Sequence, residues 1–273
     1  MLDRTIAYGL EFLFPAGDEA VGACLRRHGE FARVELDYLL EAATGAGAYI
    51  DVGANIGAIA LPFAQRRPNW RVMAIEAHRG LSGVLAANVL INRLHNVEVY
   101  HAAAGAERGL VEFPALALST KVNFGALGFK SVTGATETVR MLTLDEIAPA
   151  DTRLVKIDVE GFEPEVLKGA SALLASHKAI WIVEATIQNP EATASVIRRF
   201  QALGYGLYWF YAPFATPRSE KDPPLTAGLG DSNIIALPPG VVALWPMTAV
   251  SEADLQRPAG LKSYPYLSRY GYD

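Results

Sequence analysis

The stretch Tyr49–Gly57, which reads YIDVGANIG, decides how this chain folds. A short apolar run ends in a turn of small residues, and a helix-compatible run, 58–67, follows the turn. This order of strand, turn and helix is typical of the first unit of a nucleotide-binding α/β sheet. Gly53 and Gly57 lack a Cβ, so the backbone can turn tightly there and approach a ligand. Asp51, near the end of the strand, supplies a hydrogen-bond acceptor at the same point.

A second apolar strand, 71–75, ends at Glu76. This glutamate follows the turn at about the 20-residue offset at which an acid meets the hydroxyls of a ribose. The dinucleotide fingerprint requires glycine at its second position, because the backbone must approach a pyrophosphate. Here Ala54 and Asn55 occupy that part of the turn, and the side chain of Asn55 would crowd a pyrophosphate. The sequence therefore favours a ligand with a ribose and no phosphate, of which S-adenosylmethionine (SAM) is the common one.

The composition narrows the class of protein. With 273 residues, of which 51% are hydrophobic, the chain can bury a full core, and one large domain is expected. A net charge of −5 and the lack of long basic runs argue against nucleic acid as the main partner. Cys24 is the single cysteine, so an intrachain disulfide and a cysteine-based zinc site are excluded. Because no run approaches the roughly 18 apolar residues of a membrane span, and the start resembles no signal peptide, we expect a soluble, cytoplasmic protein.

Strands and helices alternate along most of the chain, which predicts a doubly wound, mostly parallel sheet. A short connection before the last strand allows that strand to be antiparallel. Residues 1–25 are expected to form a short hairpin or coil, and the polar stretch 119–136 a loop of the kind that often covers a site. The predicted strands are 48–52, 71–75, 97–102, 154–158, 179–185, 206–211 and 233–237, and the predicted helices are 31–43, 58–67, 78–90, 164–175 and 190–203.

Charged and small residues follow the ends of two further strands. Lys156, Asp158 and Glu160 crowd the end of the fourth predicted strand. Ligands of an open parallel sheet bind at the carboxyl ends of its strands, so we interpret these charges as functional. The third predicted strand ends in small residues that include Ala103, and a flat ring such as adenine would fit against them.

At this point several motifs together resemble the FkbM-type SAM-dependent methyltransferases. They are YIDVGANIG, the strand-end Glu76, NVLIN (88–92), TLDEI (143–147) and KIDVEGFEPEVLKGA (156–170), with Glu184 in IVEA and Asn233 in NIIAL. The pairing of DVGANIG with KIDVEG is the specific part, and the resemblance covers about residues 49–237. It implies a class I methyltransferase fold, which is Rossmann-like with seven strands, SAM as methyl donor, and usually O-methylation of a small molecule or glycan.

The resemblance also implies roles for single residues. It places Asp158 beside the reaction centre and Glu76 on the ribose of SAM. Around the methionine part of SAM it places Asp51, Gly53, Ala54, Asn55 and Gly57. The family usually has proline after the strand-two acid, whereas this chain has Ala77 and His78. This departure leaves Glu76 intact but changes the loop that follows it.

From the extent of these motifs we expect the chain to consist of three regions. An N-terminal segment, 1–47, brings a helix that leads into the central strand and packs on the core. The SAM-dependent methyltransferase domain is expected to span 48–240, and a tyrosine-rich tail, 241–273, follows it. The tail tyrosines suit either acceptor recognition or the cover of a neighbouring subunit in a homo-oligomer.

Methyl transfer from a sulfonium is an in-line displacement, so the enzyme chiefly positions its reactants. An alcohol also loses a proton, and a base or a metal assists that loss. Our hypothesis is that Asp158 or Glu160 is the base and that Lys156 tunes or orients it. A less favoured alternative is a divalent metal held by Asp158, Glu160 and Glu184, since carboxylates suit Mg²⁺ or Ca²⁺.

The sequence does not identify the molecule that accepts the methyl group. Aromatic residues in and just after the sixth predicted strand would stack on a sugar ring or a planar acceptor, and we assign Trp209 and Tyr211 to that role. The full set is Tyr208, Trp209, Phe210, Tyr211 and Phe214. O-methylation of a sugar, glycan or small natural product is the leading interpretation, and N-methylation of a peptide or small molecule is an alternative. A non-catalytic binding module of the same fold is a further alternative, and an NAD-dependent oxidoreductase is disfavoured by Asn55.

Overall fold

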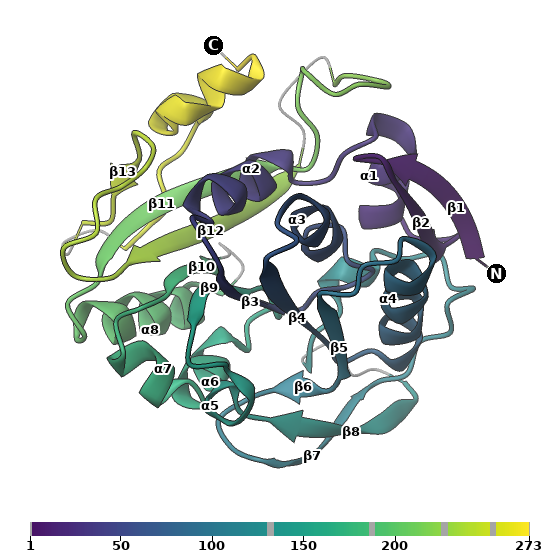
Figure 1. The fold of residues 1–273 in the computed structure, drawn as a ribbon, viewed down its shortest axis with the longest axis horizontal. Helices are drawn as coiled ribbons and strands as arrows, with labels where there is room; N and C mark the ends of the chain where they lie inside the picture. The colour runs from purple at the N-terminus through teal and green to yellow at the C-terminus, as the bar shows by residue number, and fades with distance from the viewer. Residues whose placement is uncertain (1, 130–133, 186–188, 225–228, 252–254, 273) are drawn as a thin grey trace.

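The computed structural model describes residues 2–129, 134–185, 189–224, 229–251 and 255–272. The strands of the main sheet are β3 (Gly47–Val52), β4 (Trp70–Glu76), β5 (Val97–His101), β9 (Thr152–Ile157), β10 (Ile180–Glu184), β11 (Gly206–Pro213), β12 (Gly230–Leu237) and β13 (Thr248–Ala249). Within the described residues they form one eight-stranded sheet in the order β13-β11-β12-β10-β9-β3-β4-β5 (Figure 1).

The direction of the strands agrees with the doubly wound fold predicted from the sequence. Strands β5, β4, β3, β9 and β10 run parallel to one another, and β12 runs antiparallel to both β10 and β11. The predicted antiparallel last strand is therefore confirmed, and the two-residue strand β13 adds an eighth strand that the sequence did not indicate. The chain is thus a doubly wound α/β protein with a mostly parallel sheet, as predicted.

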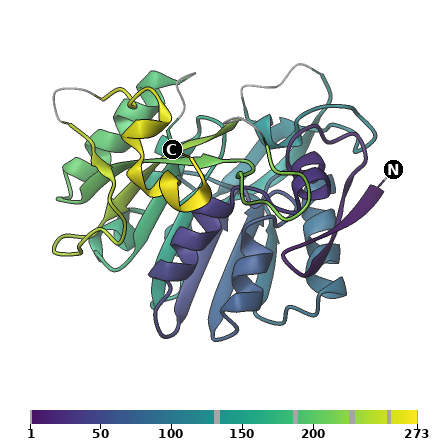
Figure 2. The same cartoon turned by 90° about the horizontal axis from the view of Figure 1, so that it is seen from above.

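Helices cover both faces of the sheet. On one face lie α2 (Arg33–Ala42), α3 (Ala60–Arg66) and α4 (Arg79–Ile91), which stand side by side in Figure 2. On the other face lie α6 (Glu163–Lys168), α7 (Ser171–Ala175) and α8 (Pro190–Gln201), as Figure 1 shows. A second sheet, made of β6 (Ala103–Ala104), β8 (Thr136–Leu142) and β7 (Gly109–Pro114), follows β5, and α5 (Leu144–Ile147) connects it to β9.

The strand order reverses between β3 and β9, which lie next to each other although the chain visits β4 and β5 in between. On one side of this point the chain proceeds through β4 to β5, and on the other through β10. Such a switch point opens a crevice at the carboxyl ends of the strands, where ligands of α/β sheets bind. The YIDVGANIG turn follows β3, and Asp158 follows β9, so both motifs lie at this crevice.

The helix predicted for 164–175 is two helices, and this prediction was wrong for a steric reason. Helix α6 ends at Lys168 and α7 begins at Ser171. Between them, a Cβ on Gly169 would lie 2.0 Å from the carbonyl oxygen of Gly105. The backbone of this segment therefore packs directly against the segment after β6, and the helix breaks where the two meet.

The first residues form the predicted hairpin, with β1 (Leu2–Ala7) paired to β2 (Leu10–Pro15), and a helix that the sequence did not indicate, α1 (Val21–His28), follows. Asn88 of α4 attaches this hairpin. Its amide nitrogen donates to the carbonyl oxygens of Leu13 (2.9 Å) and Ile56 (3.0 Å), and its side-chain oxygen accepts from the N–H of Leu13 (2.7 Å). Asn88, the first asparagine of NVLIN, thus gives the backbone of Leu13 in β2 the hydrogen bonds that a neighbouring strand would otherwise provide.

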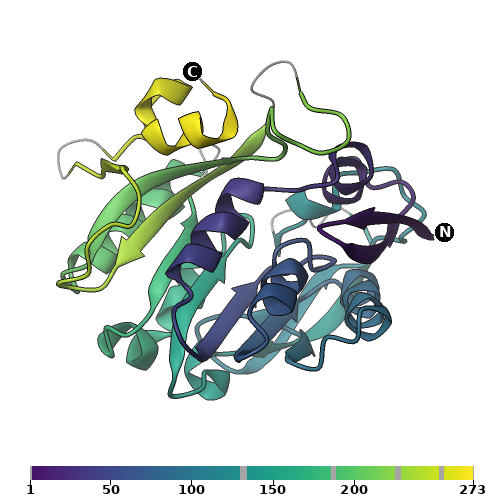
Figure 3. The same ribbon diagram turned by 45° about the horizontal axis from the view of Figure 1, so that its top comes forward.

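The tyrosine-rich tail packs on its own chain. In Figure 3 it lies against β11 and the end of α2. The hydroxyl of Tyr266 bonds both backbone groups of Tyr211, and Tyr272 donates to the carbonyl of Ala215. The described tail tyrosines are therefore buried against their own chain. Within the described residues no helix has the length and apolarity that a membrane crossing requires.

Candidate functional site

The turn after β3 brings the two sides of the crevice together. Gly53 has φ +82°, and a Cβ on it would lie only 1.8 Å from the carbonyl oxygen of Asp158. Only glycine fits this position, because both the backbone angle and the contact exclude a side chain. Asn55 also has a positive φ of 52°, which asparagine tolerates better than most residues. The turn therefore places the ends of β3 and β9 in direct contact.

Gly57 lies where two helices meet. A Cβ on Gly57 would lie 2.6 Å from Leu61 and 2.8 Å from Leu85, and Gly57 lines neither of the cavities described below. This glycine lets the start of α3 pack against α4.

A first cavity opens on the β4 side of the turn. Glu76 and His78 line it from the end of β4, and Ala103 lines it from β6. Phe124 and Leu127, from the loop predicted to cover a site, complete the lining. The cavity thus combines a carboxylate with small and aromatic residues, the surroundings predicted for a ribose and an adenine ring.

Glu76 is buried, with 7% of its surface exposed. One carboxylate oxygen accepts the N–H of Asn55 (2.9 Å), and the other accepts the N–H of His78 (2.8 Å). Burial raises the pKa of Glu76 to about 7, although both backbone hydrogen bonds act in the opposite direction. Each carboxylate oxygen can accept a second hydrogen bond, so the group can still bind a diol.

His78 stabilises the loop after Glu76, where the sequences that the motifs resemble usually have a proline. Its Nδ1 accepts the N–H of Leu81 (3.2 Å), which caps the start of α4, and its Nε2 lies 2.9 Å from the carbonyl oxygen of Leu116. With Nδ1 as acceptor, the proton is on Nε2 and points to Leu116. Burial lowers the pKa of His78, so the neutral ring is favoured. The role of His78 is therefore to hold the loop after Glu76.

A second cavity opens on the β9 side of the turn. Its polar lining contains Asp51, Lys156, Asp158, Glu160 and Asp231, and Ala54 of the turn also lines it. Four residues line both cavities: Gly53, Asn55, Gly125 and Asp158. The two cavities therefore meet at the turn and at the Asp158 side chain.

Asp51 is the most deeply buried of these acids, with 1% exposure. Its Oδ1 has no hydrogen-bond partner among the described residues. Burial raises the pKa of Asp51 to about 6, although Lys156 opposes the shift. A buried, unpartnered carboxylate oxygen is costly unless a ligand satisfies it. The ammonium of the methionine part of SAM is a group that fits this oxygen, so the residues present fit the cofactor that the motifs imply.

Lys156 is the cation of this region. Its Nζ lies 2.8 Å from Oδ2 of Asp158 and 4.0 Å from Oε1 of Glu35 in α2. Burial disfavours the charge of Lys156, but Asp158, Glu35 and Asp51 outweigh it and raise the lysine pKa well above its ordinary value. Burial in turn raises the pKa of Glu35 to about 7. Lys156 is thus a charged, immobile group that fixes the position of Asp158.

The structure brings together three of the predicted carboxylates. One oxygen each of Asp158, Glu160 and Glu184 lies within 4.8 Å of the others. Glu160 has a positive φ of 53°, and burial, followed by the charge of Asp158, raises its pKa to about 7. The same two causes raise the pKa of Glu184 well above its ordinary value. The sequence alone could not show that these three carboxylates converge.

Two aromatic residues line the second cavity: Phe214, which belongs to the aromatic set predicted from the sequence, and Phe31, which the sequence analysis did not assign to the site. The rings of Phe31 and Phe214 stack with centroids 5.0 Å apart, and both line the cavity. Tyr8 holds the backbone of Phe31, since its hydroxyl bonds both the N–H and the carbonyl at 2.9 Å. The carbonyl of Phe214 accepts from the thiol of Cys24 at 3.2 Å. We call this pair of rings the roof of the second cavity.

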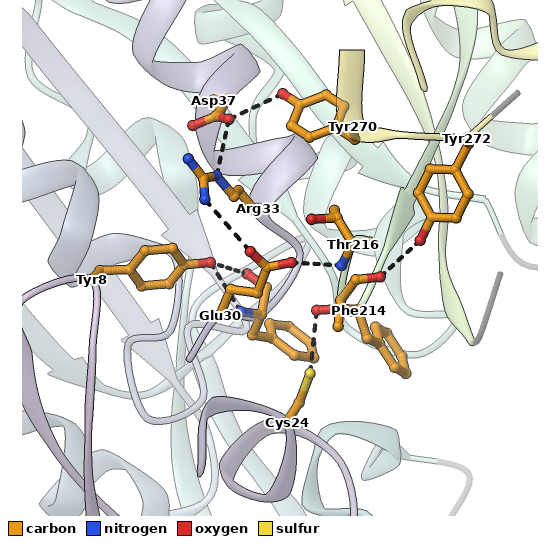
Figure 4. Close-up of polar contacts among 11 residues, drawn as sticks. Tyr8, Cys24, Glu30, Arg33, Asp37, Phe214, Thr216, Tyr270 and Tyr272 are labelled. Atoms are coloured by element: carbon orange, nitrogen blue, oxygen red, sulfur yellow. Dashed lines mark hydrogen bonds and ion pairs between the residues drawn. The ribbon is translucent and has the colours of Figure 1, made fainter. Parts of the chain in front are cut away.

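A polar network behind the roof joins segments that are far apart in the sequence (Figure 4). One oxygen of buried Glu30 accepts the N–H of Thr216 (2.6 Å), and the other lies 3.7 Å from Arg33. Arg33 also lies 3.5 Å from Asp37, which accepts from the hydroxyl of Tyr270 (3.1 Å). The N-terminal segment, the loop after β11 and the tail are thus tied into one support.

Trp209 and Tyr211, which the sequence predicted to bind the acceptor, lie away from this roof. Trp209 is 2% exposed and lines a separate cavity with Arg257. Tyr211 is 8% exposed and packs against Tyr264, with Arg257 over its ring. Neither residue lines the two cavities beside the turn. The structure thus brings together the predicted cofactor and catalytic residues but not these two aromatics.

Comparison with known families agrees with the motifs. The family described as the methyltransferase FkbM domain matches residues 51–207, which is more than half of the chain. No curated protein matches the sequence.

Solved structures resemble the chain at low identity. A methyltransferase FkbM from Methylobacillus flagellatus is 17% identical, with a TM-score of 0.49 over 72% of this chain and 45% of that chain. A precorrin-6y C5,15-methyltransferase from Geobacter metallireducens is 14% identical, with a TM-score of 0.48 over 76% of this chain and 87% of that one. A SAM-dependent O-methyltransferase from Thermotoga maritima is 12% identical, with a TM-score of 0.43 over 78% and 66%. The chain thus spans less than half of the Methylobacillus protein.

Proposed function

Because the chain belongs to the FkbM family of SAM-dependent methyltransferases, we propose that it methylates a hydroxyl group of a sugar, a glycan or a small natural product. The adenosine part of SAM occupies the first cavity in this proposal, with the adenine ring near Ala103 and the ribose on Glu76. The methionine part extends past the Gly53–Asn55 turn into the second cavity, where Asp51 meets its ammonium group.

The observation that carries the proposal is the position of Asp158. Its side chain lines both cavities, and Lys156 holds one of its oxygens at 2.8 Å. The point at which cofactor and acceptor meet is therefore next to a fixed carboxylate. SAM, when bound, supplies an electrophilic methyl group, and the rest of the chemistry consists of positioning and of removing one proton.

The residues of the second cavity suit a hydroxyl acceptor. Asp158 or Glu160 accepts a hydrogen bond from the acceptor hydroxyl and then its proton, as the oxygen takes the methyl group. Lys156 keeps Asp158 in place. The expected gain from a positioned base is about 10²–10⁴-fold in rate.

The roof supports an acceptor with a flat or ring-shaped apolar face. Phe31 and Phe214 offer such an acceptor a ring to stack on, while the acids below accept hydrogen bonds from its hydroxyls. Sugars combine these two properties, since one face of a pyranose carries C–H groups and its edge carries hydroxyls. N-methylation is the alternative outcome, which an acceptor screen distinguishes.

Calorimetric titration of the purified chain with S-adenosylhomocysteine, and with NAD as the comparison, tests the cofactor part of the proposal. We expect micromolar binding of the first and none of the second. A screen with radiolabelled SAM against sugars, glycans, hydroxylated natural products and amines then tests the acceptor. Transfer to amines but to no hydroxyl would contradict the proposal, and binding of S-adenosylhomocysteine without transfer to any acceptor would favour a non-catalytic module.

A further inference from the structure

The carboxylates of Asp158, Glu160 and Glu184 come from two neighbouring strand ends. Asp158 and Glu160 follow β9, and Glu184 is the last residue of β10. The two strands are parallel, with Ile157 opposite Val183, so their ends coincide. One oxygen from each acid lies within 4.8 Å of the other two. Three acids of like charge are thus held together by the sheet itself.

Glu184 gives this cluster its second, independent feature. The residue is 6% exposed, and its Oε2 has no hydrogen-bond partner among the described residues. Burial of a carboxylate without a partner costs several kcal/mol of folding free energy. Glu184 lines neither cavity, so neither SAM nor an acceptor in those cavities would satisfy it. A ligand bound between the three acids would do so.

The charges around the cluster are not balanced by the protein. Asp231 and Glu160 line the same cavity as Asp158, and the cation at hand is Lys156. Its Nζ contacts Asp158 and Glu35, and no ion pair links a cation to Glu160 or Glu184 in the described part of the chain. The acids of this region thus outnumber its cation, and a bound cation would balance part of their charge.

We propose that Asp158, Glu160 and Glu184 bind one divalent cation that prefers oxygen ligands, such as Mg²⁺, Mn²⁺ or Ca²⁺. Carboxylate oxygens coordinate Mg²⁺ at about 2.1 Å and Ca²⁺ at about 2.4 Å, so opposite ligands are about 4.2 Å or 4.8 Å apart. The observed 4.8 Å limit matches these spacings with little or no movement of the side chains. The cation also supplies the partner that Glu184 lacks.

The place of this cation gives it a role in the proposed methyl transfer, and this role rests on that proposed function. Asp158 and Glu160 line the second cavity, whereas Glu184 does not. A cation held by the three acids would therefore border the cavity in which we propose that the acceptor binds. An acceptor hydroxyl, or two neighbouring hydroxyls of a sugar, would complete the coordination and be oriented by it.

Binding of Mn²⁺ to the purified full chain tests the proposal without any acceptor. After removal of metals with EDTA and dialysis, titration followed by calorimetry is expected to show one Mn²⁺ per chain. Glu184→Gln and Glu160→Gln each weaken binding about tenfold or more, because each removes a charged ligand. Glu35→Gln is the matched control: it removes a buried acid beside Lys156 outside the cluster, and it changes Mn²⁺ affinity less than about threefold.

Several results would overturn the proposal. They are absence of Mn²⁺ binding to the wild type, wild-type affinity in both ligand variants, or equal loss in Glu35→Gln. Binding of S-adenosylhomocysteine to each variant confirms that it is folded, and Glu160, which is only partly buried, is the safer substitution. If S-adenosylhomocysteine binds and Mn²⁺ does not, the metal site is contradicted and the methyltransferase proposal stands. If Mn²⁺ binds and S-adenosylhomocysteine does not, the metal site stands and the cofactor part of the proposed function is contradicted. Once an acceptor is known, turnover that EDTA leaves unchanged would contradict the role in orienting it.

Discussion

The ammonium of Lys156 lies 2.8 Å from the carboxylate of Asp158, and both residues line the second cavity. They stand two positions apart at the end of β9, so their side chains share one face of the strand. Lys156 is 5% exposed, whereas Asp158 is partly exposed. The aspartate is therefore the member of the pair that is more accessible from the cavities. The pair thus presents a single oriented carboxylate where the two cavities meet.

Asp158→Asn is expected to lower the rate of methyl transfer about 10²-fold or more. The amide cannot accept the proton, yet it retains the shape that the cofactor contacts, so the affinity for S-adenosylhomocysteine stays within about threefold. Turnover with radiolabelled SAM and calorimetry measure the two effects separately. Near-normal turnover in the variant would contradict the assignment of Asp158.

Glu76→Gln is expected to weaken binding of S-adenosylhomocysteine about tenfold to a hundredfold, because it removes a charged hydrogen-bond acceptor for the ribose. Wild-type affinity should also fall as the pH is lowered through about 7, the pKa of Glu76, since the ionised form accepts from the diol. The variant lacks this dependence. Calorimetry at several pH values checks both statements, and parallel pH profiles for the two proteins would contradict them.

The same carboxyl links the stability of the ligand-free protein to pH. Burial raises the pKa of Glu76 from 4.5 to about 7, so the folded chain binds a proton more tightly than the unfolded chain. The resulting stabilisation is fully present below pH 4.5 and is lost as the pH rises through 7. We expect the unfolding free energy of the wild type, relative to Glu76→Gln, to fall by about 1.4 kcal/mol per pH unit in this window. Urea unfolding of both proteins measures the slope, and a rising difference would contradict the assignment.

Gly53→Ala is expected to destabilise the protein by about 3 kcal/mol or more, since the new Cβ would overlap the carbonyl of Asp158. Gly45→Ala is the matched control. Gly45 also has a positive φ, of 67°, but open space surrounds it, so this change should cost only about 1 kcal/mol. Denaturant unfolding of the two variants separates the contact from the backbone angle. Equal losses would show that the contact with Asp158 is unimportant.

Phe31→Leu and Phe214→Leu are expected to raise the KM for the acceptor several-fold while leaving S-adenosylhomocysteine binding unchanged. Leucine keeps the roof apolar but removes the flat ring, and an aromatic contact contributes about 0.5–1.5 kcal/mol. Trp209→Leu provides the comparison, because Trp209 lies away from both cavities. If the tryptophan variant alone changed the acceptor KM, the aromatics predicted from the sequence would be the binding residues.

The sequence indicated which residues gather at the first cavity because these residues are close together along the chain. Gly53, Asn55 and Glu76 lie within a short stretch, and one strand–turn–helix–strand unit brings them together. The same is true of Lys156 and Asp158, which share a strand end. In each case the order of residues along the chain already fixes which groups meet.

The lining of the second cavity depends on contacts that no local pattern reveals. Phe31 and Phe214 meet although most of the chain lies between them, and nothing in the sequence pairs them. The composition of the sixth strand indicated a set of aromatic residues that includes Phe214, but it could not tell which members of the set line a cavity. Gly169 ends a helix because of a backbone oxygen from another segment, and this too is invisible in the sequence.

The roof of the second cavity is built from segments that take no part in the first. Phe31 belongs to the N-terminal segment and Phe214 to the loop after β11, whereas the cofactor cavity is lined by the turn, β4 and β6 and by the loops near them. In the proposed function, substitutions at Phe31 and Phe214 would therefore alter acceptor preference while leaving the residues of the first cavity in place. For protein engineering, these two positions are the ones to vary when a different acceptor is wanted.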